Sequence, residues 1–139
     1  MIDFLEKRKK YLIYLPLYLY WLILLTLTSI PGPALPTQIT FNDKLEHLSA
    51  FMILGILLSL SLKVQNKFKL LKDRFFIATF IIGVVYGSLD EIHQLFIEGR
   101  SCDILDVTAD TIGVSIGISL VALIMFIDRL KQPKTDLLN

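Results

Sequence analysis

The amino-acid sequence predicts an all-α integral membrane protein, built as a bundle of four transmembrane helices. The chain has 139 residues, of which 54% are hydrophobic and only 19% are charged. Its mean hydropathy is +0.63. It contains four apolar runs, each close to the roughly 20 residues that a helix needs to cross the hydrocarbon core of a bilayer. The length fits one domain, so a single membrane domain over residues 1–139 is expected.

The first expected helix spans residues 11–30, which contain no charged residue. It follows the basic segment Lys7-Arg8-Lys9-Lys10, so a signal peptide is an alternative interpretation. The run is longer than the apolar core of a typical signal peptide, and it ends at Pro31-Gly32-Pro33 without a small-x-small cleavage site. A retained membrane helix is therefore expected.

Each of the other three expected helices is polar at one end and apolar along the rest. Residues 45–62 carry Glu46 and His47 at their start and no charge afterwards. Residues 75–97 are apolar up to Leu89 and then become polar, and residues 104–127 begin among acidic side chains. Because successive spans alternate in direction, these three polar ends are expected at the same face of the membrane.

The distribution of lysine and arginine predicts the orientation, because cytoplasmic loops are enriched in these residues. With four spans, twelve of the fourteen basic residues fall on one side. Only Lys44 and Arg100 fall on the other. Both termini are therefore expected in the cytoplasm, and the polar helix ends are expected at the extracytoplasmic face.

Acidic side chains inside a membrane segment point to a functional site. An ionised side chain near the bilayer centre costs at least about 2.5 kcal/mol. Asp90 and Asp110 are expected about two turns inside their helices, where they need partners. The candidate ligand-binding residues lie around them: Asp43, Lys44, His47, Asp90, Glu91, Gln94, Arg100, Asp103, Asp106 and Asp110. If a reaction is catalysed, Asp90, Glu91 and His47 are the candidate acids and bases.

Several of these residues also have a purely structural interpretation. Asp43 and Asp103 are placed to cap the starts of their helices. Arg100 and Asp106 can form an ion pair that holds the loop between them. Gly113 lies on the same stripe as the acids of its helix, and this stripe of small residues is typical of close helix packing.

The sequence argues against several other classes of site. No HExxH or comparable ligand spacing is present, so no metal is expected. No phosphate-binding loop or dinucleotide fingerprint occurs, so no cofactor is expected. A net charge of +1 gives no reason to expect a nucleic-acid partner. The single cysteine, Cys102, excludes an intramolecular disulfide.

Two segments together resemble the VanZ-like family. Asp43-Lys44-Leu45-Glu46-His47 is similar to its DK-x-x-H element. Residues 86–94 contain Asp90-Glu91-Ile92-His93-Gln94, similar to its DE-x-x-Q element, and a Gly99-Arg100 turn and spaced acids follow. The likeness covers roughly residues 40–120. The chain departs from the family pattern at Asp110, where an asparagine is usual, and at Phe51, where a tyrosine is common.

The resemblance implies a multi-pass protein of the bacterial cytoplasmic membrane, associated through its family with resistance to the glycopeptide teicoplanin. The preferred hypothesis is binding or modification of a lipid-linked or cell-envelope molecule at the outer leaflet, with membrane lipids and a lipid-linked cell-wall precursor or a glycopeptide as partners. Arg100, with Lys44, would hold an anionic group. A proton-coupled or small-solute transporter is one alternative, and a structural or assembly protein without a ligand is another.

Overall fold

The computed structural model of the chain describes residues 2–32 and 41–131. In these residues the secondary structure is entirely helical. The elements are α1 (Ile2–Lys7), η1 (Lys10–Tyr14), α2 (Leu15–Thr28), α3 (Phe41–Val64), α4 (Lys69–Asp73), α5 (Phe75–Gln94) and α6 (Ile104–Leu130). Four helices are long and apolar enough to cross a membrane, over Lys10–Thr28, Asp43–Val64, Phe75–Gln94 and Ile104–Leu130. The prediction of four membrane-spanning helices is confirmed.

The helix boundaries differ from the expected ones at the polar ends. The second helix was expected from residue 45 but begins at Phe41, four residues earlier. The third was expected to continue to residue 97 but ends at Gln94, and tight turns lead to Gly99, whose φ of 71° is a left-handed conformation that suits glycine. Asp90 therefore lies about one turn from the end of its helix, not two.

The first span begins with a short π-helix. The backbone N–H of Leu15 donates to the carbonyl of Lys10, five residues earlier, and α2 follows. Pro16 lies in the first turn of α2, and the helix is nevertheless continuous from Lys10 to Thr28. The proline therefore does not interrupt the span.

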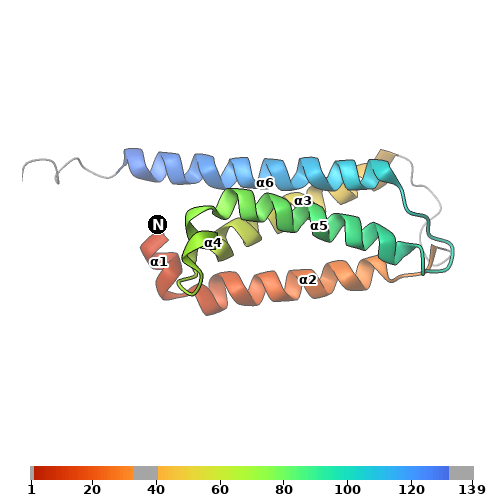
Figure 1. Cartoon of the computed structure of the whole chain (residues 1–139), viewed down its shortest axis with the longest axis horizontal. Coiled ribbons are helices and arrows are strands. Elements are labelled where there is room, and N and C mark those ends of the chain that lie inside the picture. Colours follow the sequence, from red (N-terminus) through yellow and green to blue (C-terminus); the bar gives the residue numbers. More distant parts are fainter. Residues whose placement is uncertain (1, 33–40, 132–139) are drawn as a thin grey trace, which may run out of the picture.

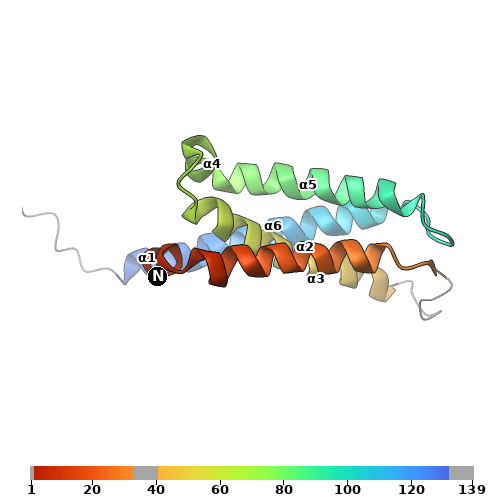
Figure 2. The same ribbon diagram turned by 90° about the horizontal axis from the view of Figure 1, so that it is seen from below.

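The helices run side by side, with α3 at the centre of the bundle. α3 packs most extensively on α6 and also contacts α5 and α2. α1, α4 and the end of α6 lie at one end of the bundle, and the α5–α6 connection lies at the other (Figures 1 and 2). The two termini of the described helices thus share one end.

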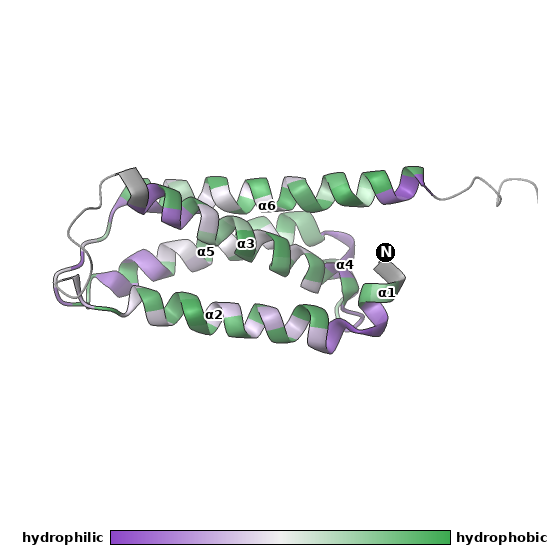
Figure 3. Cartoon of the chain, turned by 180° about the vertical axis from the view of Figure 1, so that it is seen from behind, coloured by the Kyte–Doolittle hydropathy of each residue, from purple (hydrophilic) through white to green (hydrophobic). Residues whose placement is uncertain are grey.

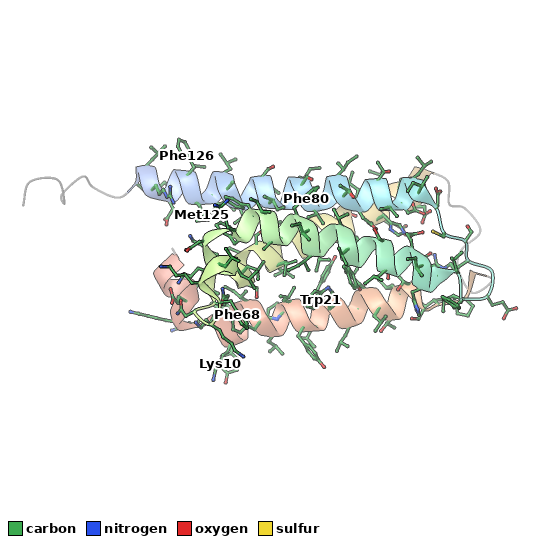
Figure 4. The ribbon with its side chains drawn as sticks, in the orientation of Figure 1. Lys10, Trp21, Phe68, Phe80, Met125 and Phe126 are labelled. Carbon is green, nitrogen blue, oxygen red and sulfur yellow. The ribbon has the colours of Figure 1, made fainter. Side chains whose placement is uncertain are left out.

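Apolar side chains cover the outside of the bundle as well as its core. Figure 3 shows hydrophobic residues along the helices and hydrophilic ones gathered toward the two ends. Phe126 on α6 points outward, whereas Trp21 lies between α2 and α5, with its ring centre 5.9 Å from that of Tyr86 (Figure 4). An apolar exterior is what acyl chains require of a membrane helix.

Candidate functional site

Three helix ends meet at the end of the bundle that contains the α5–α6 connection. They are the start of α3, the end of α5 and the start of α6, and the end of α2 lies beside them (Figure 1). Of the seven buried polar or charged residues in the described part of the chain, five lie here: Asp90, Glu91, Gln94, Asp106 and Asp110. We call these five residues, with Lys44, His47 and Asp103, the polar cluster.

Lys44 joins α3 to the start of α6. Its ammonium donates to Asp103 Oδ2 at 2.7 Å and to Asp106 Oδ1. It also lies 3.6 Å from Asp43, in the first turn of its own helix. Asp106 is 5% exposed, so Lys44 compensates a carboxylate that is almost removed from solvent.

Asp103 has two roles in this arrangement. Its side chain accepts the backbone N–H of Leu105 at 2.8 Å and so caps α6, as one of the structural interpretations expected. It also receives the Lys44 ammonium. The hydrogen bond from Lys44, followed by that from the Leu105 N–H, holds the pKa of the Asp103 carboxyl below its usual range. Asp43 does not cap α3, because the helix already begins at Phe41.

His47 and Asp110 form the second link between α3 and α6. His47 Nδ1 lies 3.0 Å from Asp110 Oδ1. Asp110 is 1% exposed, and its other oxygen, Oδ2, has no hydrogen-bond partner among the described residues. A buried carboxylate oxygen of this kind is a strong acceptor left without a donor.

Glu91 links α5 to the start of α6. Its Oε2 accepts the backbone N–H of Asp103 at 2.9 Å, and its Oε1 accepts the side-chain amide of Gln94 at 2.9 Å. Glu91 is 1% exposed. It therefore turns away from lipid and toward α6.

A cavity of about 330 Å³ opens beside the polar cluster, between α2, α3 and α5. One wall is apolar and includes Leu24, Leu27, Phe51 and Ile53. The rest is mainly polar and includes the predicted site residues Asp43, His47, Asp90, Gln94 and Arg100, together with Glu46. Asp90 is buried, and its Oδ2 has no hydrogen-bond partner among the described residues.

Arg100 does not pair with Asp106, so the ion pair considered from the sequence is not formed. Its Nε donates to the carbonyl of Ile30 at 3.2 Å, and its Nη2 donates to that of Leu27 at 3.3 Å. Leu27 lies in the last turn of α2 and Ile30 lies just after it, and carbonyls at a helix end lack the i+4 N–H partner of the helix interior. Within residues 2–32 and 41–131, no carboxylate forms a salt bridge with Arg100. These two carbonyls engage two of its five N–H donors, and the other three have no partner in the described part of the chain.

All ten predicted site residues thus lie at one end of the bundle, but they divide between two places. Asp43 and Arg100 line the cavity, and His47, Asp90 and Gln94 line it while also belonging to the polar cluster. The other five join helices within the cluster: Lys44, Glu91, Asp103, Asp106 and Asp110. His93 lies apart, 3.1 Å from the hydroxyl of Ser29. One ligand atom each from His47, Glu91 and Asp106 lies within 4.8 Å of the others, which is a possible metal-binding arrangement.

The contribution of α2 to the cavity was missed at the sequence level. Tyr20, Leu24, Leu27 and Thr28 line it, and the Tyr20 hydroxyl donates to the carbonyl of Ala50 at 2.9 Å. These residues belong to an uninterrupted apolar run in the sequence. No local signal marks which of its faces lies against α3.

A comparison with protein-family models decides the relationship of this chain to known proteins. The model of the VanZ/LLP1 family matches residues 7–126. The chain belongs to the VanZ/LLP1 family. The expected family relationship is confirmed, and it extends beyond residues 40–120 to include the first span. Comparisons with curated proteins and with solved structures gave no match.

The two elements that carry the family resemblance meet in space in this VanZ/LLP1 protein. Lys44 and His47 of the first element contact acids of α6, and Glu91 of the second contacts the Asp103 backbone. Asp110, the position at which the resemblance led us to expect asparagine, is the direct partner of His47. An asparagine there would still accept a hydrogen bond from the ring but would carry no charge.

Proposed function

We propose that this protein binds or modifies a lipid-linked or cell-envelope molecule in its cavity, at the extracytoplasmic face of the bacterial cytoplasmic membrane. We further propose that this activity contributes to glycopeptide (teicoplanin) resistance. The observation that carries the proposal is the two-sided lining of the cavity, apolar on α2 and α3 and charged around Asp90 and Arg100. A lipid with a polar headgroup has the same two-sided character.

The lining residues suggest how such a molecule would be held. An acyl or polyprenyl chain would lie against Leu24, Leu27 and Ile53. The three N–H donors of Arg100 that lack a partner among the described residues would bind a phosphate or carboxylate of the headgroup. Asp90 and Glu46 would accept hydrogen bonds from sugar hydroxyls, and Oδ2 of Asp90, which no described residue contacts by a hydrogen bond, supplies one acceptor. Lys44 is already paired with two acids, so Arg100 is the better anion-binding residue.

If the ligand is also modified, Asp90 and His47 are better placed than Glu91 to exchange protons with it. Both line the cavity. Glu91 is turned toward the Asp103 backbone and accepts hydrogen bonds on both oxygens. Its role would be to position the start of α6.

The distribution of buried polar residues favours binding over transport. Of those in the described part of the chain, only Ser59 and Thr79 lie outside the polar cluster. They are uncharged and bond to each other at 3.3 Å. A proton or ion pathway needs ionisable groups or water along its length. Proton flux in liposomes, lost on Asp110→Asn, would instead support transport.

The proposal is tested by teicoplanin susceptibility of cells that express the protein. Wild type is expected to raise resistance, and Arg100→Ala and Asp90→Asn are each expected to lower it toward the level of the empty vector. Arg74→Ala and Asp73→Asn are matched controls, because these residues lie at the opposite end of the bundle. Membrane levels of all variants are compared by immunoblot. Full resistance in both site variants would contradict the site assignment.

If the polar cluster has a purely structural role, the variants are expected to differ in stability as well as in resistance. In that case each substitution would lower thermal stability in detergent in proportion to the resistance it removes. For ligand binding we expect Asp90→Asn to remove resistance with little change in stability, because asparagine has nearly the same volume and keeps one oxygen acceptor.

A further inference from the structure

We propose that His47, Glu91 and Asp106 form a binding site for a divalent transition-metal ion such as Zn²⁺. One ligand atom from each residue lies within 4.8 Å of the others. The residues come from α3, α5 and α6, whose ends meet in the polar cluster. One imidazole nitrogen with two carboxylate oxygens is a donor set that suits Zn²⁺ or Mn²⁺, whereas Mg²⁺ and Ca²⁺ prefer oxygen alone.

Asp110 gives an independent reason to infer a ligand at His47. An ionised carboxylate only accepts hydrogen bonds, so the 3.0 Å contact with Asp110 Oδ1 places a proton on His47 Nδ1. In the neutral imidazole, the lone pair of Nε2 is then available to a metal. Metal-binding histidines typically donate their other N–H to a carboxylate in this way. Asp110 is also buried, and its Oδ2 lacks a partner among the described residues.

The charges around the site favour an additional cation. Four buried acids lie in the cluster: Asp90, Glu91, Asp106 and Asp110. Lys44 is the one lysine or arginine that contacts them among the described residues, and it is shared with Asp103. Excess negative charge in a low-dielectric region is unfavourable unless protons or cations neutralise it. A divalent ion would neutralise two of these charges at once.

The site requires only small movements to close around an ion. Ligand atoms bound to Zn²⁺ at about 2.0–2.2 Å lie roughly 3–4 Å from one another, so the three side chains must approach by about 1 Å. Lys44 competes for Asp106, and on metal binding it would keep its contact with Asp103. Glu91 retains lone pairs on both oxygens after accepting its two hydrogen bonds.

Three protein ligands leave at least one coordination position open, as in catalytic zinc sites. His47 also lines the cavity, so this position would lie near an anionic group bound there. The spacing along the chain gave no indication of the site, because each ligand lies on a different helix. The metal proposal does not depend on lipid binding, and it is tested without lipid ligands.

The test is titration of ZnCl₂ into the full-length, chelator-treated protein in detergent, followed by isothermal calorimetry and elemental analysis. One ion per chain is expected, bound in the micromolar range or tighter. MgCl₂ and CaCl₂ are expected to bind more weakly. Substitution with Co²⁺ is expected to give the intense visible absorption of a four- or five-coordinate site.

Three variants test which residues bind the ion, and a fourth variant is the matched control. His47→Ala and Glu91→Gln are expected to weaken binding more than tenfold, and Asp110→Asn about 10–100-fold through the orientation of His47. His93→Ala removes the chain's other histidine, which contacts Ser29, and should leave binding unchanged. Helicity measured by circular dichroism verifies that each variant folds.

The proposal is overturned if the wild-type chain binds no zinc in the micromolar range. Zinc binding that His47→Ala leaves intact and His93→Ala abolishes would also overturn it. If the ligand variants fail to fold, the Co²⁺ spectrum of the wild-type chain decides. A weak octahedral spectrum, typical of ions held mainly by water, would contradict the site.

Discussion

The ammonium of Lys44 lies between the carboxylates of Asp103 and Asp106 and connects α3 to α6. Removing one partner of a buried ion pair costs about 3–5 kcal/mol, because the other charge is left without compensation. The Lys44 side chain is 28% exposed, which reduces the expected loss.

We therefore expect Lys44→Met to lower the free energy of unfolding by about 2–3 kcal/mol. Asp106→Asn is expected to cost less, since Lys44 keeps Asp103 as a partner. Thermal unfolding of both variants in detergent measures the difference. Equal stability of Lys44→Met and wild type would contradict the proposed importance of this contact.

Asp103 gives a prediction for the pH dependence of stability. Because its folded-state pKa is lowered from 3.8, it contributes stability that is fully present above about pH 4 and is lost as the pH falls through the lowered value. The difference in melting temperature between wild type and Asp103→Asn is therefore expected to shrink as the pH falls below 4. Asp73→Asn, exposed at the opposite end, is the matched control. A difference that stays constant down to pH 2 would contradict the lowered pKa.

The residues of the polar cluster could be predicted from the sequence, but the pairs that they form could not. The intramembrane acids and the two basic residues are visible in the sequence because charge is rare in these runs. Which base pairs with which acid depends on where each helix begins. α3 starts four residues earlier than expected, and Lys44 then meets the start of α6 while Arg100 turns to the end of α2.

The contact between helices α3 and α6 depends on two glycines of α6. A Cβ at Gly113 would clash with the backbone carbonyl oxygen of Leu48, and one at Gly117 would clash with that of Met52. Neither obstacle is the end of a flexible side chain, so the helices would have to separate. The stripe of small residues in the sequence predicted this close packing.

Gly117→Ala is accordingly expected to destabilise the protein by about 2 kcal/mol or more, within the range for overpacked interiors. Ser119→Ala on the same helix is exposed and is expected to change stability by less than about 0.5 kcal/mol. Thermal unfolding in detergent compares the two. A neutral Gly117→Ala would show that α3 and α6 are farther apart than described.

The four membrane-spanning helices were predictable because long apolar runs are a strong signal. The residues at which these helices begin and end were not predictable in the same way. Three residues of the expected third helix instead form turns that lead to Gly99, and the Gly32 N–H donates to the Glu98 carbonyl at 2.8 Å in that connection. This contact joins segments 66 residues apart in the sequence. Local patterns contain no information about such a pairing.

The orientation of the bundle in the membrane is open to a direct test. Cys102 is exposed in the α5–α6 connection, at the end of the bundle that contains the polar cluster. Lysine and arginine gather at the other end, which predicts that Cys102 is extracytoplasmic. A membrane-impermeant maleimide is expected to label it in intact cells.

The control for this experiment uses the opposite end of the bundle. In the double variant Cys102→Ser, Lys67→Cys, the cysteine lies between α3 and α4. It is expected to react only after the membrane is permeabilised. Labelling of the Lys67→Cys protein but not the wild-type chain in intact cells would reverse the orientation and place the site in the cytoplasm.

We propose that the cavity holds an amphiphilic molecule through Arg100, and a comparison of lipid binding tests this directly. Native mass spectrometry of the full-length protein in detergent compares undecaprenyl phosphate with undecaprenol, which differ only in the anionic group. Wild type is expected to bind the phosphate about tenfold more tightly, an effect of charge-assisted hydrogen bonds, and Arg100→Ala should lose this preference while Arg74→Ala keeps it. Equal binding of the two lipids by wild type, or an unchanged preference in Arg100→Ala, would contradict the account.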